Sequence, residues 1–563
     1  MKLYLIFFFS LAFGTTLAQN QYPKNYFDSP LKIPIILSGT FGELRSNHFH
    51  SGIDIKTQGK EGLPIYAPAD GYISRIKVGQ YGFGKALYMN HPNGYTTVYA
   101  HLRKFAKNIQ SFVKETQYKK EKYAIGNLFP KQDRFIIKKG DIIGYTGDTG
   151  SSGGPHLHYE IRNTKTENII NPLFFSFNVN DNIKPTVNQL MVYPLSNDAR
   201  INNFAKNTAL ELKNIKEGEF VTDRIYASGS IGFGINVFDR LDGASNKNGI
   251  FSLEMKVNGN RVYYHDLETF SFSESKFINL HIDYAHYKKY RKKFQKTHKV
   301  PANKLSLYED LVNNGKITVE ENSNYTVEII SSDFKKNKTR IKIPIKGVKS
   351  NLIFKKLDTT KHKIKTGDFN KFKLQNVTVA FPKNTFYEDC FIDFELNNGV
   401  ASIHERTVPL DKRYTLTFGI SHLSDAQREQ VYIANVDNPK YPRYVSTKKK
   451  TDKVYTSTKS LGKYTLNYDT KKPSITPVNF QKGKWISKNK TLKVKIKDKE
   501  TGIRNYRATI DNEWILMEYN HKKGILTYNF SDKKLVGSKH IFKIVVSDNV
   551  GNTKTLKTAF FKK

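Results

Sequence analysis

Two short histidine-bearing segments, more than a hundred residues apart, constrain the fold of this chain more than any other feature. The first is His50-Ser51-Gly52-Ile53-Asp54, the second is His156-Leu157-His158, and Tyr99-Ala100-His101 lies between them. In an extended strand, side chains at i, i+2 and i+4 share one face. The first segment therefore presents His50 and Asp54 on one face and its isoleucine to the core, and the histidines of the second segment share a face likewise.

We expect these segments to be neighbouring strands that bring four ligand-type side chains together, namely His50, Asp54, His156 and His158. Gly52 lies between the first two and is predicted to leave room for an ion. Imidazole nitrogen and carboxylate oxygen are ligands that Zn²⁺ favours, and its catalytic sites keep one position open for water. The pattern therefore predicts one zinc site.

The alternative interpretation is that these histidines are ordinary residues. A single histidine is more often a surface or satisfied core residue than a ligand, and a His-x-His pair alone arises by chance in many chains. The Gly-rich approach to His156 and the combination of both segments favour the metal site. His48 also lies at an even offset from His50, and we interpret it as a neighbour of the ligands or part of a substrate rim.

Several motifs in the same order resemble the lysostaphin/LytM-type zinc metalloendopeptidases, which cut peptide bridges in bacterial cell walls. They are His-x-Gly-x-Asp, a Tyr-x-His strand end and the run Thr149–His158, within roughly residues 40–175. Pro64–Gly71 and Lys139–Gly144 resemble the connecting strands of the family. The resemblance implies the zinc ligands His50, Asp54 and His158, with His156 as the catalytic base and His101 as its electrostatic partner. The sequence does not separate the two catalytic roles.

The fold class expected for the chain is all-β, because 563 residues are too many for one core and most segments alternate as short strands. We expect an antiparallel, barrel-like peptidase domain followed by three β-sandwich-like modules, with one or two helical insertions. The predicted boundaries are 1–18 for a signal peptide, 19–178 for the peptidase domain, 183–347 for an immunoglobulin-like domain, 350–470 for a third β domain and 471–563 for a second immunoglobulin-like domain.

Two insertions and one internal repeat support this division. Residues 103–138 carry apolar side chains at helical spacing, which predicts either a peripheral helix or a wall or lid of the substrate cleft. Residues 281–316 are dense in Lys, Tyr and His and are also predicted to be helical. Phe238–Gly243 and Val327–Asn337 have later counterparts at Ile496–Ile503 and Ile544–Asn552, and strand, Asp-rich turn and strand resemble bacterial immunoglobulin-like modules.

The N-terminus predicts export. Lys2 precedes an apolar run from Leu3 to Phe13 and a small-residue end, which predicts a secretory signal peptide cut after Ala18. No cysteine follows this run, so we expect no lipid anchor, and no later segment is typical of a transmembrane helix. Cys390 is the single cysteine, so no intramolecular disulfide can form. We expect the periplasm, the cell envelope or the extracellular space.

The charge of the chain bears on its partners, because 91 Lys and Arg face 51 Asp and Glu. Such a surface attracts polyanions, and with no nucleic-acid-binding motif we expect peptidoglycan or another anionic wall polymer. The resemblance implies a zinc metalloendopeptidase that hydrolyses peptidoglycan stem or cross-link peptides with metal-activated water. The alternatives are a catalytically silent or gated regulator of other wall hydrolases, and a secreted protease acting on proteins. The oligomeric state stays open.

Overall fold

Antiparallel pairing of short strands builds nearly all of the computed structural model, which describes residues 22–349 and 359–563. The expected signal peptide over residues 1–18 lies outside the described residues. The strands fall into four units, each with its own apolar core: β1–β12, β13–β26, β27–β38 and β39–β46. Among the described residues, no helix combines the length and the apolar character needed to cross a bilayer.

The first unit is built on an open antiparallel sheet with the order β1-β2-β11-β6-β5-β4-β8. Its edge strands do not pair with one another, so the expected antiparallel sheet is confirmed and stays open rather than closing into a barrel. The strands of the sheet are β1 (Leu37–Gly39), β2 (Ile53–Lys56), β4 (Gly71–Val78), β5 (Lys85–Asn90), β6 (Tyr95–Ala100), β8 (Gly126–Leu128) and β11 (His156–Asn163), with β9 (Ile136–Ile137) and β12 (Ile169–Ile170) at its margins. A small second sheet contains β3 (Pro64–Tyr66), β7 (Lys104–Phe105) and β10 (Ile142–Tyr145).

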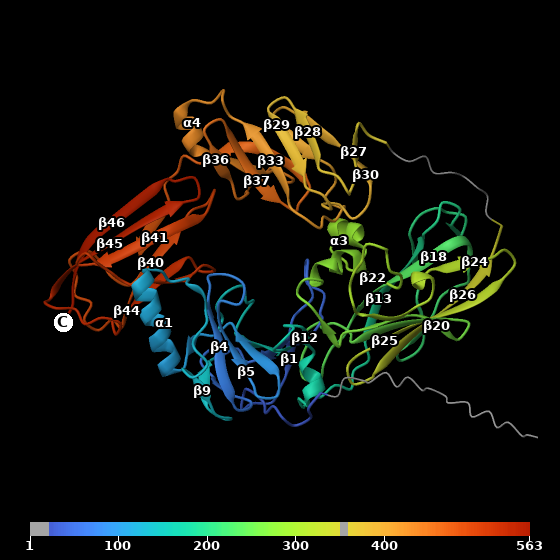
Figure 1. The fold of residues 1–563 in the computed structure, drawn as a ribbon, viewed down its shortest axis with the longest axis horizontal. Coiled ribbons are helices and arrows are strands. Elements are labelled where there is room, and N and C mark those ends of the chain that lie inside the picture. The colour runs from blue at the N-terminus through green and yellow to red at the C-terminus, as the bar shows by residue number, and fades with distance from the viewer. Residues whose placement is uncertain (1–21, 350–358) are drawn as a thin grey trace, which may run out of the picture.

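The insertion over residues 103–138 contains the long helix α1 (Lys107–Lys120). Its buried face consists of Ile109, Val113 and Gln117, which pack on the core of the first unit as the helical spacing predicted. The other side of the helix meets the fourth unit, because Tyr118 packs edge-on against Trp514 with ring centroids 5.2 Å apart. In Figure 1, α1 accordingly lies between these two units.

The second unit is a large, mostly antiparallel assembly around the long strand β18 (Ile225–Phe238), with the order β15-β13-β18-β26-β25-β19-β20-β23. Residues 281–316 are only partly helical, since α3 is followed by short strands that pair with β18 and β20. The other elements are β13 (Thr186–Pro194), β14 (Arg200–Ile201), β15 (Thr208–Leu210), β16 (Lys213–Lys216), β17 (Glu219–Val221), β19 (Ser252–Val257), β20 (Asn260–Asp266), β21 (Thr269–Phe270), α2 (Ile278–His281), α3 (Tyr284–Tyr290), β22 (Gln295–Lys296), β23 (Tyr308–Leu311), β24 (Ile317–Val319), β25 (Asn324–Ser332) and β26 (Lys338–Gly347).

The third and fourth units each pack two main sheets face to face, as alternating strands allow. The third contains β27 (His362–Ile364), β28 (Asn370–Leu374), β29 (Val377–Phe381), β30 (Cys390–Ile392), β31 (Phe394–Asn397), β32 (Val400–Ile403), β33 (Tyr414–Gly419), α4 (Asp425–Gln430), β34 (Val431–Asn435), β35 (Arg443–Tyr444), β36 (Lys448–Lys450), β37 (Lys453–Thr458) and β38 (Gly462–Tyr468). The fourth contains β39 (Ser474–Pro477), β40 (Thr491–Lys497), β41 (Ile503–Ile510), β42 (Glu513–Trp514), β43 (Glu518–Asn520), β44 (Ile525–Asn529), β45 (Lys539–Asp548) and β46 (Thr553–Phe561).

The four units are arranged in a closed ring, in which the fourth returns to the first (Figure 1). Strand β21 of the second unit pairs with β12 and so extends the sheet of the first unit. The fourth unit contacts the first through ion pairs, including Lys85 with Glu518 at 2.8 Å and Asp148 with Lys522 at 2.7 Å. The first unit is therefore held from both sides.

Candidate metal centre

The two predicted histidine segments meet on neighbouring strands of the first unit. Strand β11 lies between β2 and β6, and its register places His158 opposite Asp54 on one side and opposite Ala100 on the other. Ile53 and Ile55 are fully buried in the core, so Asp54 points to the opposite face of the sheet. The alternation of the sequence thus brought Asp54 and His158 to the same face, as predicted.

Gly52 has a different structural role from the expected one of leaving room for an ion. A Cβ atom at this position would lie 2.3 Å from the carbonyl oxygen of Tyr159 and 2.9 Å from Cγ of Glu160. The glycine is required because the backbone of β11 passes directly beside it, so the expectation that it leaves room for an ion is wrong. The close approach allows His50, just before β2, to reach the same spot as Asp54.

His101 reaches the centre by a turn rather than by strand alternation. Tyr99 is fully buried and packs on Tyr159 in the core, with its hydroxyl 2.8 Å from Oγ1 of Thr97. Strand alternation would place Thr97, Tyr99 and His101 on one side of the sheet, but the first two point away from the metal centre. His101 has a φ of +63°, and this left-handed residue after β6 breaks the alternation and turns its ring to the other face.

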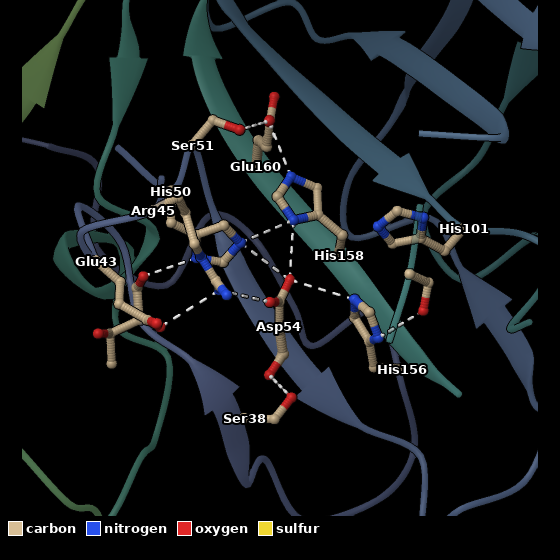
Figure 2. Close-up of polar contacts among 12 residues, drawn as sticks. Ser38, Glu43, Arg45, His50, Ser51, Asp54, His101, His156, His158 and Glu160 are labelled. Carbon is tan, nitrogen blue, oxygen red and sulfur yellow. Dashed lines mark hydrogen bonds and ion pairs between the residues drawn. The ribbon is translucent and has the colours of Figure 1, made fainter. Parts of the chain in front are cut away.

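Three ligand atoms converge within hydrogen-bonding distance of one another (Figure 2). Nε2 of His50 lies 3.1 Å from both Oδ1 of Asp54 and Nδ1 of His158. Nδ1 of His158 lies 2.9 Å from the same oxygen of Asp54. These separations are close to the edge of a tetrahedron with ligand bonds of about 2.0 Å, which is roughly 3.3 Å.

The opposite nitrogen of each ring fixes its tautomer. Nδ1 of His50 donates to the carbonyl oxygen of Thr40 at 2.7 Å, and Nε2 of His158 donates to the carboxylate of Glu160 at 2.9 Å. The nitrogens that face Asp54 are therefore the ones that can bind a cation once any proton on them is released. Because lone pairs at this distance repel unless a proton or a cation lies between them, the donor set fits a zinc ion.

The pKa values of Asp54 and His158 indicate that these two ligand residues share a proton, which a bound cation would displace. Burial raises the pKa of Asp54, but the neighbouring histidines outweigh it and hold that pKa well below its usual range. Burial lowers the pKa of His158, but its hydrogen bonds to Asp54 and Glu160 outweigh this and raise the pKa to about 9. Metal binding at such a site releases that proton.

Glu160 is a part of the centre that the sequence reading missed. It is fully buried and accepts hydrogen bonds from Ser51, from His158 and, at 2.7 Å, from Nε of Arg162. Burial raises its pKa, but Arg162 and His158 outweigh burial and lower the pKa to about 2, so Glu160 is ionised. Its position two residues after His158 on one strand, hence on the same face, was the signal that could have revealed it.

His156 and His101 lie side by side next to the three ligand atoms, with ring centroids 4.8 Å apart. Nδ1 of His156 donates to the carbonyl oxygen of Gly154 at 2.8 Å, and Nδ1 of His101 donates to that of Thr149 at 2.9 Å. Each ring therefore keeps a lone pair at Nε2, and Nε2 of His156 lies 3.5 Å from Oδ1 of Asp54. Burial, followed by the neighbouring histidines, lowers the pKa of His101 to about 3, so this ring is neutral.

The centre opens to solvent on the side of His156. The side chains of His156 and Asp54 are 14% and 13% exposed, compared with 4% for His158. On the opposite side, Arg45 lies 3.3 Å from both Asp54 and Glu43 and closes the approach. His48 is exposed and hydrogen-bonds to Asn47, away from the three ligand atoms, so the structure does not bring it into the centre.

A cavity of about 560 Å³ lies between the first and fourth units. Its lining includes Thr149, which positions His101, together with the charged side chains of Lys85, Asp148, Glu518 and Lys522. The five predicted site residues are not part of the lining. The cavity therefore adjoins the segment that holds one catalytic histidine and does not contain the metal centre itself.

Two family profiles match the chain. Peptidase family M23 matches residues 48–134 and 122–172, which include all five predicted site residues, and a Zu5-like domain matches residues 361–469. The second match falls on the third unit and accords with a chain of several domains.

Curated relatives are similar over the first unit. The DD-carboxypeptidase/endopeptidase Mpg of Neisseria meningitidis is 36% identical over 119 residues, which cover 21% of each chain. The peptidoglycan DD-endopeptidase ShyC of Vibrio cholerae is 32% identical over 99 residues, covering 18% of this chain and 17% of the relative. The match thus spans about a fifth of the length of these relatives.

Solved structures are also similar to this part of the chain. The catalytic domain of lysostaphin from Staphylococcus simulans is 23% identical, with a TM-score of 0.17, and the match covers 27% of this chain and 91% of that domain. A zinc-containing peptidase from Vibrio cholerae is 26% identical, with a TM-score of 0.18, covering 24% of this chain and 37% of that one.

Proposed function

We propose that this chain, whose residues 48–172 form a peptidase family M23 domain, is a zinc metalloendopeptidase that hydrolyses peptide bonds of peptidoglycan. The observation that carries the proposal is the convergence of one ligand atom each from His50, Asp54 and His158 beside two further imidazoles. Relatives named as DD-endopeptidases support peptidoglycan as the substrate class.

The three converging side chains would hold the zinc ion, and Glu160 and Thr40 would orient the two histidine ligands through their opposite nitrogens. Bound zinc supplies Lewis-acid chemistry at this position, since it polarises a carbonyl group and lowers the pKa of water to about 7. Arg45 forms an ion pair with Asp54 at 3.3 Å on the side away from His156.

His156 is proposed as the general base. Its Nε2 lies 3.5 Å from Oδ1 of Asp54, and its Nδ1–H donates to the carbonyl oxygen of Gly154. It accepts the proton of the attacking water and returns it to the leaving amine. The orientation of the ring by Gly154 and Ser152 ensures that this lone pair faces the reaction.

His101 is proposed as the second catalytic histidine. Its Nδ1–H is bound to Thr149, so in the neutral state its Nε2 accepts a hydrogen bond from water or from a substrate N–H. It stabilises an oxyanion only after gaining a proton, which then makes Nε2 a donor. The two histidines have equivalent hydrogen bonds, so their difference lies in position, with His156 closer to Asp54.

Export and an anionic wall as partner are part of the same proposal. The signal-peptide pattern over residues 1–18 and the excess of 91 basic over 51 acidic residues support action in the periplasm, the cell envelope or the extracellular space.

The test uses residues 19–563 and the variant His158→Ala. Zinc is measured by elemental analysis, both proteins are incubated with purified sacculi, and the released muropeptides are identified by mass spectrometry. We expect zinc-dependent loss of cross-linked dimers with the parent protein and no loss with the variant.

The other outcomes discriminate between the alternatives. Bound zinc with intact sacculi would favour a gated or regulatory role, and cleavage of unrelated proteins in preference to sacculi would favour a general protease. If the parent protein bound no zinc, the proposal of a zinc metalloendopeptidase would be contradicted.

A further inference from the structure

A second cluster of metal-type side chains lies in the second unit, remote from the histidines. Asp181, Asp239 and Asp333 bring one carboxylate oxygen each within 4.8 Å of the others. Asp181 belongs to the segment that joins the first and second units, Asp239 directly follows β18, and Asp333 directly follows β25. We call these three residues the acidic trio.

The acidic trio is buried, and its charges have no basic partner. Asp239 and Asp333 are each 2% exposed, and Asp181 is 9% exposed. Besides burial, the charged groups that act on Asp239 are the other two carboxylates, and those that act on Asp181 are Asp333 and Asp242. Burial and these like charges raise the pKa of Asp239 to about 8 and also raise that of Asp181. Buried carboxylates in this state require a proton or a cation.

One oxygen of the trio has no hydrogen-bond partner although it is buried. Oδ1 of Asp239 is unpartnered, and so are both polar side-chain atoms of Asn248, which is itself 2% exposed. Asp239 and Asn248 face each other in an antiparallel bridge, with backbone hydrogen bonds of 2.9 and 2.8 Å in both directions. Their side chains therefore point to the same side of the bridge. This places the unpartnered amide oxygen of Asn248 next to the unpartnered carboxylate oxygen of Asp239.

The equivalent position in the fourth unit shows how such a cluster is satisfied without an ion. Asp469, Asp498 and Asp548 occupy the matching places in the internal repeat. There Oδ1 of Asp498 accepts three backbone N–H groups at 2.8 to 3.1 Å, and Oδ1 of Asp548 accepts three at 2.8 to 3.0 Å. Asp333 of the acidic trio likewise accepts the backbone and side-chain amides of Asn337 at 2.8 and 2.6 Å, so the two clusters differ at Asp239, whose Oδ1 accepts none of the donors that Asp498 has. We therefore infer no ion in the fourth unit.

We propose that the acidic trio, with the amide oxygen of Asn248, is a binding site for a calcium ion that fixes the joint between the first and second units. Ca²⁺ takes carboxylate, amide and carbonyl oxygens in irregular geometry, and a set with no nitrogen or sulfur ligand disfavours zinc. The ion would cross-link the joining segment to two strand ends of the second unit. Next to the site, Phe334 packs on Phe174 of the first unit with ring centroids 5.1 Å apart, so the joint carries an interface that the ion would hold.

The test uses the zinc-loaded chain from residue 19, freed of calcium by passage over a chelating resin. Ca²⁺ alone is then titrated by isothermal calorimetry, and hydrogen exchange is followed by mass spectrometry with and without about 1 mM Ca²⁺, the range of extracellular modules. We expect one calcium ion per chain and slower exchange in peptides covering residues 236–250 and 329–340. A hundredfold excess over Kd should raise the thermal midpoint of the second unit by about 5 °C.

The variants are Asp239→Asn and, as a matched control at the equivalent position of the repeat, Asp498→Asn. Asp239→Asn should abolish the calcium heat and the protection, while its calcium-free form stays folded because one of three repelling charges is removed. Asp498→Asn should retain both responses. The proposal would be overturned if the parent protein released no heat on calcium addition, or if Asp239→Asn responded to calcium as the parent does. Loss of the calcium response in Asp498→Asn would also overturn it. Zinc content and sacculus hydrolysis report on the first unit separately.

Discussion

The first and second units both contain a cluster of buried histidines, but only one of these clusters is arranged to bind a metal. In the second unit, His265, His281 and His298 are at most 4% exposed, and the first two have ring centroids 4.9 Å apart. Their partners are neutral, since His265 meets the Tyr263 hydroxyl at 2.9 Å and His281 meets the Tyr308 hydroxyl at 2.9 Å.

The difference lies in the carboxylates. In the first unit, Asp54 stands between two imidazoles and Glu160 holds the far nitrogen of His158, so that lone pairs converge on one point. Among the described residues, the histidines of the second unit do not form a metal-type group with a carboxylate. Burial of imidazoles therefore yields a neutral polar core, and convergence around an ionised acid yields a metal centre.

The strongest test of this contrast compares His158→Ala with His281→Gln. We expect the first variant to lose its zinc and to fall to background in the sacculus assay, because one of three ligands is gone. The second should keep one zinc per chain and near-parental activity, because the hydrogen bonds of its ring go to Tyr308 and Gln295 and not to the three ligand atoms. Elemental analysis and muropeptide release are the measurements, and zinc loss in both variants would break the distinction.

His156→Gln separates holding the metal from using it. Its expected phenotype is full zinc content with activity lower by about 10²- to 10⁴-fold, the usual contribution of a general acid or base. His48→Gln serves as the control, because His48 is exposed and bonds only to its neighbour Asn47. Equal loss of zinc in His156→Gln and His158→Ala would mean that His156 is a ligand.

Glu160→Gln tests whether the buried acid behind His158 tunes the centre. We expect zinc affinity to fall by about 10- to 100-fold, because the amide no longer stabilises the N–H of the ligating ring as a carboxylate does. Affinity is measured by competition with a zinc-binding dye. The matched control is Glu167→Gln, which also contacts Arg162 but does not touch His158. Unchanged affinity in Glu160→Gln would remove this residue from the centre.

Lowering the pH should destabilise the second unit through its buried neutral histidines. Burial lowers the pKa of His281 from 6.5 to about 4, so between these values the unfolded chain binds more protons than the folded one. The contribution of the neutral ring to the free energy of unfolding is therefore largest above pH 6.5. It falls by up to about 3 kcal/mol as the pH is lowered to 4. Urea unfolding between pH 7 and 4 should therefore show a shallower pH dependence in His281→Gln, and identical slopes would contradict this account.

Sequence reasoning placed Asp54 and His158 together because strand periodicity is local. Asp54 and His158 each lie on a strand whose buried neighbours fix the face, so alternation was sufficient to place both side chains. The same rule does not extend to His101, because this residue follows the end of β6 and its positive φ turns the ring to the other face of the sheet. Glu160 was within reach of the rule and was missed because no motif points to it.

The sequence by itself determined the all-β character, the presence of a metal-type histidine and aspartate set, and the internal repeat, since each of these is written in spacings of a few residues. Only the tertiary structure decided that Gly52 makes way for the β11 backbone, that the sheet stays open, and that Asp181 joins Asp239 and Asp333. These features depend on which strand edges and linkers come to lie side by side. Such contacts join residues far apart in the chain, and no local periodicity encodes them.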